Sequence, residues 1–340
     1  MGIQGLTKII GDHAPTAIRE TTIKAYQGRK VAVDASMFLY QFLIAIRTDA
    51  AQLMDADGNT TSHIAGTFYR TIRMMEHGIL PVYVFDGTPP ELKAVELQKR
   101  ASKRNAAAGA LNGGDIDKVQ HDKRVVKVTR EHVNDVKSLL TLMGVPWLDA
   151  PTEAESTCAA LCKAGLVYGV ASEDLDTLTF GAPILLRNLT ASEARKLPVM
   201  EIRLPQVLEG LGLTYDAFVD MCILLGCDYC ETIKGVGRVR AVNLIKQHGS
   251  IDDILQVLDP VKNTLPDPFP YLEIRELFKS PDVVDVSKVK LQWKMPDKEA
   301  LIAYLVDKSF NVERVTSAVE RLIKYRSSGR QTHLDSFFKK

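Results

Sequence analysis

Short apolar runs alternate with segments of helical periodicity between residues 29 and 190. Apolar runs set between helical patterns are typical of buried strands in a parallel sheet. Segments whose apolar residues recur every three or four positions predict the helices that connect such strands. The predicted strands cover residues 30–34, 81–86, 145–149, 167–172 and 183–188, and the predicted helices cover residues 36–47, 62–77, 90–104, 129–143 and 152–164.

The rest of the chain is mostly helical by the same criterion, over residues 204–326, with strand-like pieces near residues 199–203 and 288–293. The pattern therefore predicts an α/β fold, in which helices flank a central, mostly parallel twisted sheet. A linker-like Ser/Gly segment at 327–330 precedes a short terminal motif.

Three of the predicted strands end in aspartate. Asp34 and Asp86 each end an apolar run, and Asp174 and Asp176 follow a third. Ligands of parallel sheets bind at the carboxyl ends of the strands. Four aspartates at one edge would form an oxygen-rich, negative pocket, which suits hard divalent cations and metal-dependent chemistry on phosphates.

Three further acids are candidates for the same site. Glu153 and Glu155 open a predicted helix, and Asp228 follows the end of another. An extended backbone would turn the side chains of Asp174 and Asp176 to one side and that of Glu173 away from them.

Each of these acids also has a simpler explanation. Thr152 and Glu155 have the spacing of a capping box, and Glu153 suits the first turn of a helix. Asp86 and Asp228 could be turn residues. Together, however, clustered carboxylates would repel one another unless a cation held them. Two Mg²⁺ ions roughly 4 Å apart could then activate a water and stabilise the leaving oxygen of a phosphodiester.

Composition adds little to this picture. The 340 residues carry a net charge of +1, and neither a membrane-spanning stretch nor a secretory signal is expected. An odd number of cysteines in apolar surroundings fits a reducing compartment. Cys227 and Cys230 have the spacing of zinc ligands, with Cys158 and Cys162 as the one available second pair. Buried free thiols are the alternative that we favour.

The stretch 105–122 contains Asn-Gly-Gly, which breaks any helix, and basic residues flank it. It could be a mobile gate over an anionic substrate or a solvated surface excursion. The flanking basic residues are Lys99, Arg100, Lys103, Arg104, Lys123, Arg124, Lys127 and Arg130.

A glycine pair, Gly235 and Gly237, lies between two helical patterns and beside Lys234, Arg238 and Arg240. Glycines let a backbone approach phosphate closely, and the following helix presents its first amides. The segment resembles the hairpin of helix-hairpin-helix modules, which grip duplex backbone without reading sequence. A plain helix connection is the alternative.

An aromatic side chain near arginines suits stacking on an unpaired base beside bound phosphates. The first predicted helix carries Tyr40 and Arg47, and the next carries Arg70 and Arg73. For Tyr40 alone, membership of a generally aromatic segment is an equally simple explanation.

The last residues fit the pattern Q-x-x-L-x-x-F-F. One tight turn would bring Leu334, Phe337 and Phe338 to one side as a hydrophobic plug, with Gln331 as a polar anchor. Two adjacent exposed phenylalanines after a linker favour a docking motif over an ordinary apolar terminus.

Taken in order, these motifs resemble the flap endonucleases of the structure-specific 5′ nuclease superfamily, of the eukaryotic flap endonuclease 1 type, from Met1 to about Lys340. The resemblance implies a Mg²⁺-dependent 5′ flap endonuclease with 5′–3′ exonuclease activity. Such an enzyme hydrolyses phosphodiesters at branched DNA junctions in Okazaki fragment maturation and base excision repair. The motifs are Met1-Gly-Ile-Gln-Gly-Leu6, Val33-Asp-Ala-Ser36, Tyr83-Val-Phe-Asp-Gly87, Ala150-Pro-Thr-Glu-Ala-Glu155, Glu173-Asp-Leu-Asp176 and Leu225-Gly-Cys-Asp-Tyr229.

The resemblance also implies roles for single residues. Lys93 and Arg100, on the gateway helix, would act in catalysis at the scissile phosphate. Two Mg²⁺ ions, or Mn²⁺ in their place, would be held by Asp34, Asp86, Glu153, Glu155, Asp174, Asp176 and Asp228. DNA would be bound by Gly2, Tyr40, Arg47, Arg70, Lys93, Arg100, Glu153, Gly226, Asp228, Gly235 and Gly237, with K⁺ at the hairpin. The sliding clamp, proliferating cell nuclear antigen, would be bound by Gln331, Leu334, Phe337 and Phe338.

We expect a monomer that binds no membrane, in the nucleus (nucleolus and nucleoplasm) and also in the mitochondrion. Rival interpretations are a sister 5′ exonuclease and a non-catalytic, clamp-tethered junction-binding protein. The resemblance also implies a division into regions. An N-terminal nuclease region at 1–104 is followed by a mobile cap or gateway at 105–122 and by an internal nuclease region at 123–260, which contains the helix-hairpin-helix at about 217–250. A C-terminal helical part of the core at 261–326 precedes a linker with the clamp-binding tail at 327–340.

Overall fold

The computed structural model describes residues 2–48, 61–98, 101–102, 128–191 and 196–327. In this part of the chain, seven strands form one sheet in the order β1-β7-β6-β5-β2-β3-β4. The strands are β1 (Ile18–Thr21), β2 (Lys30–Asp34), β3 (Leu80–Phe85), β4 (Trp147–Asp149), β5 (Gly169–Ala171), β6 (Ile184–Arg187) and β7 (Val199–Arg203).

Five neighbouring strands of the sheet, from β6 to β4 in the sheet order, are parallel, as the apolar runs predict. Strand β2 pairs with β3 on one side and with β5 on the other, while β4 and β6 extend the parallel part. Strands β7 and β1 complete it in antiparallel pairing. Strand β1 was not predicted, because its sequence Ile-Arg-Glu-Thr is polar and half exposed at an edge.

Alternate residues of the central strands enter two separate cores, one on each face of the sheet. Ala32 and Val82 pack with α1 (Leu6–His13), α7 (Ala154–Lys163), α8 (Asp176–Thr179), α9 (Leu204–Leu211), α10 (Tyr215–Leu225), α11 (Arg238–His248), α12 (Ile251–Val257) and α13 (Tyr271–Lys279). Val31 and Tyr83 pack with α2 (Ala35–Thr48), α3 (Ser62–Glu76), α6 (Arg130–Leu142), α14 (Lys298–Asp307) and α15 (Val312–Ser327). The sheet therefore lies between two helical layers.

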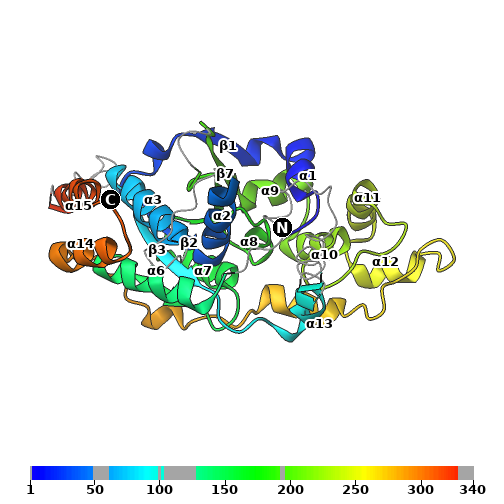
Figure 1. Ribbon diagram of the computed structural model, residues 1–340. Helices are drawn as coiled ribbons and strands as arrows, with labels where there is room; N and C mark the ends of the chain where they lie inside the picture. The colour runs from blue at the N-terminus through cyan, green and yellow to red at the C-terminus, as the bar shows by residue number, and fades with distance from the viewer. Residues whose placement is uncertain (1, 49–60, 99–100, 103–127, 192–195, 328–340) are drawn as a thin grey trace.

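Figure 1 shows the consequence for the shape: α14 and α15 lie at one end of the molecule, α11 and α12 at the other, and the sheet between them. In the described part of the chain, no helix combines the length and apolar character needed to cross a membrane.

The strand expected near residues 288–293 was wrong. A 3₁₀ turn at Val286–Lys288 is followed by irregular backbone. Trp293 donates its ring N–H to the carbonyl of Pro81 at 2.7 Å, and the Lys294 amide donates to Gly144 at 2.8 Å. The segment is thus fastened at separate points rather than by a strand ladder.

The helix expected at 90–104 begins as a 3₁₀ turn, Glu91–Lys93, and continues as α-helix over residues 94–98. Much of the rest of it lies outside the described residues, as does the whole stretch 105–122.

Candidate active site at the carboxyl ends of the strands

Adjacent strands bring the first two predicted carboxylates together. Asp34 ends β2, is buried, and accepts hydrogen bonds from the Met37 amide and the Ser172 hydroxyl, both at 3.0 Å. Asp86 follows β3 and accepts one at 2.7 Å from the Ala154 amide, the first amide of α7. Burial, followed by the negative charge of Asp86, raises the pKa of Asp34 to about 7.

The helix that Asp86 caps supplies the third carboxylate. The pKa of Glu155, whose side chain is half-buried, lies well above its ordinary value because of desolvation and because Asp34 and Asp86 are nearby. The capping-box explanation was wrong: α7 has Glu153 at its N-cap, and the Thr152 hydroxyl donates to the Asp282 carbonyl instead. Glu155 therefore faces its fellow acids.

The loop after β5 adds two more. The Asp176 amide donates to the Asp174 carboxylate at 3.0 Å, so the backbone folds into α8 instead of running on as a strand. Both side chains are nevertheless buried, and Asp176 Oδ1 has no hydrogen-bond partner in the described structure. Burial, then the charges of Asp174 and Asp228, hold the pKa of Asp176 well above its usual range.

Glu173 points away from this group, as predicted. Its carboxylate forms an ion pair with Arg187 at 3.2 Å and accepts the Asn188 amide at 2.7 Å.

Lys93 brings one positive charge to the acids. Its ammonium contacts Glu153 Oε1 and lies 3.3 Å from Asp228 Oδ2. Burial alone would lower the pKa of Lys93, but the charges of Glu155, Glu153 and Asp228 together raise it. The other oxygen of Glu153 accepts a hydrogen bond from the Tyr229 hydroxyl. Sequence reasoning missed Tyr229, although it stands next to Asp228 in a quoted motif.

The N-terminal segment lies against the site. A Cβ added to Gly2, whose φ is +78°, would stand 1.9 Å from Asp174 Oδ1 and 2.7 Å from Asp176 Oδ1. The Gln4 amide donates to the Gly226 carbonyl at 3.2 Å. A side chain at residue 2 would therefore collide with the carboxylates, which agrees with the predicted position of Gly2.

The glycine hairpin before α11 packs against the segment at residues 262–263. Gly235 has φ +84°, and a Cβ there would meet the Lys262 carbonyl at 2.8 Å. Arg240 donates to the Gly235 carbonyl at 3.0 Å and to the buried Asn263 side chain at 2.7 Å. Gly237 is the N-cap of α11 and has open space around it, so a phosphate could approach the first amides of that helix.

The predicted base-stacking group is only partly described. Tyr40 is half-buried on α2, and the Arg70 guanidinium lies 4.1 Å above the Phe42 ring. Arg73 donates to the Ala191 carbonyl at 2.7 Å. The Arg47 side chain, Arg100 and residues 331–338 lie outside what the structure describes.

Within the described residues, the two cysteine pairs do not converge as the ligands of one ion. All five are free, and the Cys227 and Cys230 sulfurs are 4.0 Å apart. Cys158, Cys162 and Cys222 are buried thiols, as favoured from the sequence.

Among the described side chains, no three His, Cys, Asp or Glu residues converge as ligands of one ion. A closed cage is not what Mg²⁺ requires, because it keeps several waters and takes one or two carboxylates. The raised pKa values at Asp34, Glu155 and Asp176 and the unpartnered oxygen of Asp176 mark an excess of negative charge. An all-oxygen donor set of this kind fits hydrated divalent cations.

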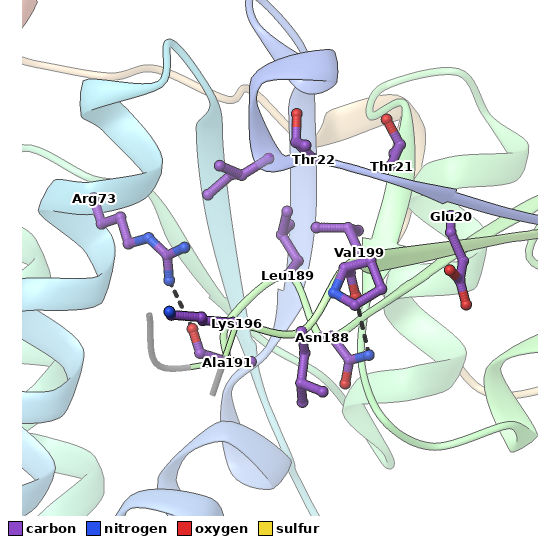
Figure 2. A pocket seen from close by; sticks show the side chains of 12 residues that line it. Glu20, Thr21, Thr22, Arg73, Asn188, Leu189, Ala191, Lys196 and Val199 are labelled. Carbon is purple, nitrogen blue, oxygen red and sulfur yellow. Dashed lines mark hydrogen bonds between the residues drawn. The ribbon is translucent and has the colours of Figure 1, made fainter. Parts of the chain in front are cut away.

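A cavity of about 460 Å³ lies elsewhere, beside β1, β7 and α3 (Figure 2). Its lining includes Arg73, Asn188, Lys196, Glu20 and Thr21. None of the seven acids lines it. The cavity and the predicted carboxylate site are therefore separate places in the described structure.

Comparison with known proteins agrees with this geometry. The XPG N-terminal domain matches residues 1–107, and the XPG I-region matches residues 144–228. Flap endonuclease 1 of Xiphophorus maculatus is 54% identical over 344 residues, which cover 99% of this chain and 90% of that protein. Flap endonuclease-1 from Methanococcus jannaschii has a TM-score of 0.73 at 36% identity, covering 93% of this chain and 98% of that one. The catalytic core of Rad2 in complex with DNA substrate has a TM-score of 0.74 at 27% identity, covering 95% and 100%. This chain belongs to the flap endonuclease 1 family of structure-specific 5′ nucleases.

Proposed function

We propose that this DNA nuclease cuts 5′ flaps at the strand-end carboxylates, by metal-assisted hydrolysis of one phosphodiester near a branched junction. It is a structure-specific flap endonuclease that acts in DNA replication and repair, as its family does. The observation that carries the proposed site is the cluster of buried acids with raised pKa values beside Lys93. Okazaki fragment maturation and base excision repair are the processes in which we expect it to act.

The seven acids are proposed to hold two Mg²⁺ ions, or Mn²⁺, together with waters and substrate phosphate. Bound cations of this kind activate water and stabilise a leaving oxygen. Asp34 and Asp86 are already oriented by hydrogen bonds to backbone amides. Lys93 is proposed to turn from Glu153 and Asp228 to the scissile phosphate, and Arg100 to join it there.

The catalytic core of Rad2 has been solved with its DNA substrate, and we propose that this chain binds branched DNA through the matching surface. Gly235 and Gly237, with the open start of α11 and a K⁺ ion, would hold duplex backbone. Tyr40, Arg47 and Arg70 would hold the strand near the cut, with Gly2 and Gly226 close to the carboxylates.

Two further proposals concern partners and place. The Q-x-x-L-x-x-F-F pattern of the tail supports docking to the sliding clamp, proliferating cell nuclear antigen, through Gln331, Leu334, Phe337 and Phe338. Clamp docking in turn supports a nuclear location, and a mitochondrial pool is proposed with it.

A labelled double-flap DNA tests the function directly. Mg²⁺ should release the 5′ flap, and EDTA or the Asp176→Ala variant should abolish release while leaving DNA binding intact. Undiminished cutting by the variant would refute the proposed site. Junction binding by the wild type without any cutting would favour a non-catalytic scaffold, and equal cutting of blunt duplex would favour a sister exonuclease.

A further inference from the structure

Tyr229 holds a fixed position at the rim of the carboxylate cluster. Its side chain is 6% exposed and packs edge-to-face on Phe278 of α13, with ring centroids 5.3 Å apart. Phe278 packs in turn on Phe180, which directly follows α8 and its Asp176 (centroids 5.0 Å apart). The ring is therefore held by an aromatic contact with α13, which Phe180 supports in turn, independently of its hydroxyl.

The hydroxyl makes the contact that matters for the site. It donates to Glu153 Oε2, while the Lys93 ammonium contacts Glu153 Oε1. Glu153 thus has one partner on each oxygen, and the two partners come from distant parts of the chain. Lys93 also lies 5.9 Å from the centre of the Tyr229 ring, a distance at which the ring face attracts a cation.

The other acids are oriented differently. Asp34 accepts a backbone amide and the Ser172 hydroxyl, and Asp86 and Asp174 each accept a backbone amide. Among the residues that the structure describes, Tyr229 and Lys93 are the donors to the Glu153 carboxylate. If Lys93 leaves to meet a phosphate, the Tyr229 hydroxyl is the donor that remains.

We propose that Tyr229 is a positioning residue, whose hydroxyl fixes the Glu153 carboxylate for a divalent cation and lets Lys93 move to the substrate. The inference rests on the proposed metal-dependent function. Partners of this kind, which orient a ligand without touching the metal, change metal affinity about 10- to 100-fold when they are removed.

Tyr229→Phe tests this by removing one oxygen and keeping the ring. Mn²⁺ alone, titrated without DNA and followed by the EPR signal of the free ion, should bind about 10- to 100-fold more weakly than to wild type. Flap-DNA affinity in EDTA should remain unchanged, and single-turnover cleavage should fall and recover in part at high metal concentration. Wild-type Mn²⁺ affinity in the variant would overturn the proposal.

Tyr271→Phe is the matched control, because Tyr271 also donates to a carboxylate, Asp252, at 2.9 Å and is outside the site. The Mn²⁺ affinity of Tyr271→Phe should equal that of wild type. If Tyr229→Phe and Tyr271→Phe lost Mn²⁺ affinity equally, the loss would be a general effect of removing a phenol hydroxyl, and the proposal would be overturned. Glu153→Ala gives the second check, since Tyr229→Phe should then cause no further loss. Additive losses would contradict action through Glu153.

The proposed function and this inference fail separately. A wild type that cuts no flap refutes the function, whereas Mn²⁺ affinity still measures the role of the hydroxyl. A wild type that cuts, an inactive Asp176→Ala variant and an unaltered Tyr229→Phe variant would remove only the inference.

Discussion

Two kinds of buried acid lie in the molecule, one on strand β7 and one at the start of α8. Glu201 on β7 is 1% exposed and accepts hydrogen bonds from Tyr26 at 3.0 Å, Tyr168 at 3.1 Å and Arg203 at 2.7 Å. Asp176 is 2% exposed, and one of its oxygens has no partner in the described structure. The two carboxylates are therefore equally buried but differ in their hydrogen bonds: Glu201 has three donors, whereas one oxygen of Asp176 has none in the described structure.

The pKa shifts follow the partners rather than the burial. Burial would raise the pKa of Glu201, but the hydrogen bonds from Arg203 and Tyr26 outweigh it and lower the pKa. At Asp176 burial is reinforced by the charges of Asp174 and Asp228. A carboxylate that the protein has satisfied stabilises the fold, whereas a group of carboxylates that it leaves in repulsion stores free energy that an incoming cation can release.

Removal of Glu201 should have the largest effect on stability. Glu201→Ala leaves the buried Tyr26 phenol, the half-buried Tyr168 phenol and the Arg203 guanidinium without their acceptor, which we expect to cost about 2–4 kcal/mol of unfolding free energy. Arg203 is partly exposed, so water recovers some of its loss. Urea unfolding measures the effect, and the folded variant should still cut flap DNA. A loss below ~1 kcal/mol would show that the network is not structural.

Asp176→Asn should act in the opposite direction. It removes one charge from a repelling group and keeps the size of the side chain, so the metal-free protein should gain about 1–2 kcal/mol. Cleavage should be lost in the same variant. Urea unfolding in EDTA tests the gain; a variant less stable than wild type would mean that the acids are not in net repulsion. Saturating Mg²⁺ should stabilise the wild type more than the variant.

The sequence predicts contacts between residues on adjacent strands better than contacts between elements that are far apart in the chain. The apolar runs predict the parallel strands, and the strand ends predict that Asp34 and Asp86 meet, because parallel neighbours share one carboxyl edge. Glu201 could not be distinguished in this way, since its three donors come from elements far apart in the chain.

The local backbone and side-chain geometry at the site was harder to predict than which residues would lie there. Asp174 and Asp176 were expected on extended backbone. Instead, the Asp176 amide donates a hydrogen bond to the Asp174 carboxylate, and α8 starts there. The capping-box alternative at Thr152 was wrong for a related reason: the Thr152 hydroxyl donates to the carbonyl of Asp282, 130 residues further along the chain, and not to the amides of α7. Tyr229 was missed because packing on Phe278, and not its own motif, directs its hydroxyl to Glu153.

The pH dependence of stability should separate the two kinds of acid without any substitution. Asp34, whose folded pKa of about 7 exceeds the ordinary value, binds more protons folded than unfolded between about pH 4 and 7. Metal-free protein should therefore become more stable, by roughly 1–3 kcal/mol, as pH falls from 8 to about 5. Glu201, whose folded pKa is lowered, contributes stability that is present above its ordinary pKa and is lost only at lower pH. Saturating Mg²⁺ should cancel or reverse the first trend, because protons then compete with the cation for the same oxygens. Unfolding curves at each pH, with Mg²⁺ and with EDTA, measure both trends. A metal-free stability that rises from pH 5 to pH 8 would contradict the repulsion on which the proposed site rests.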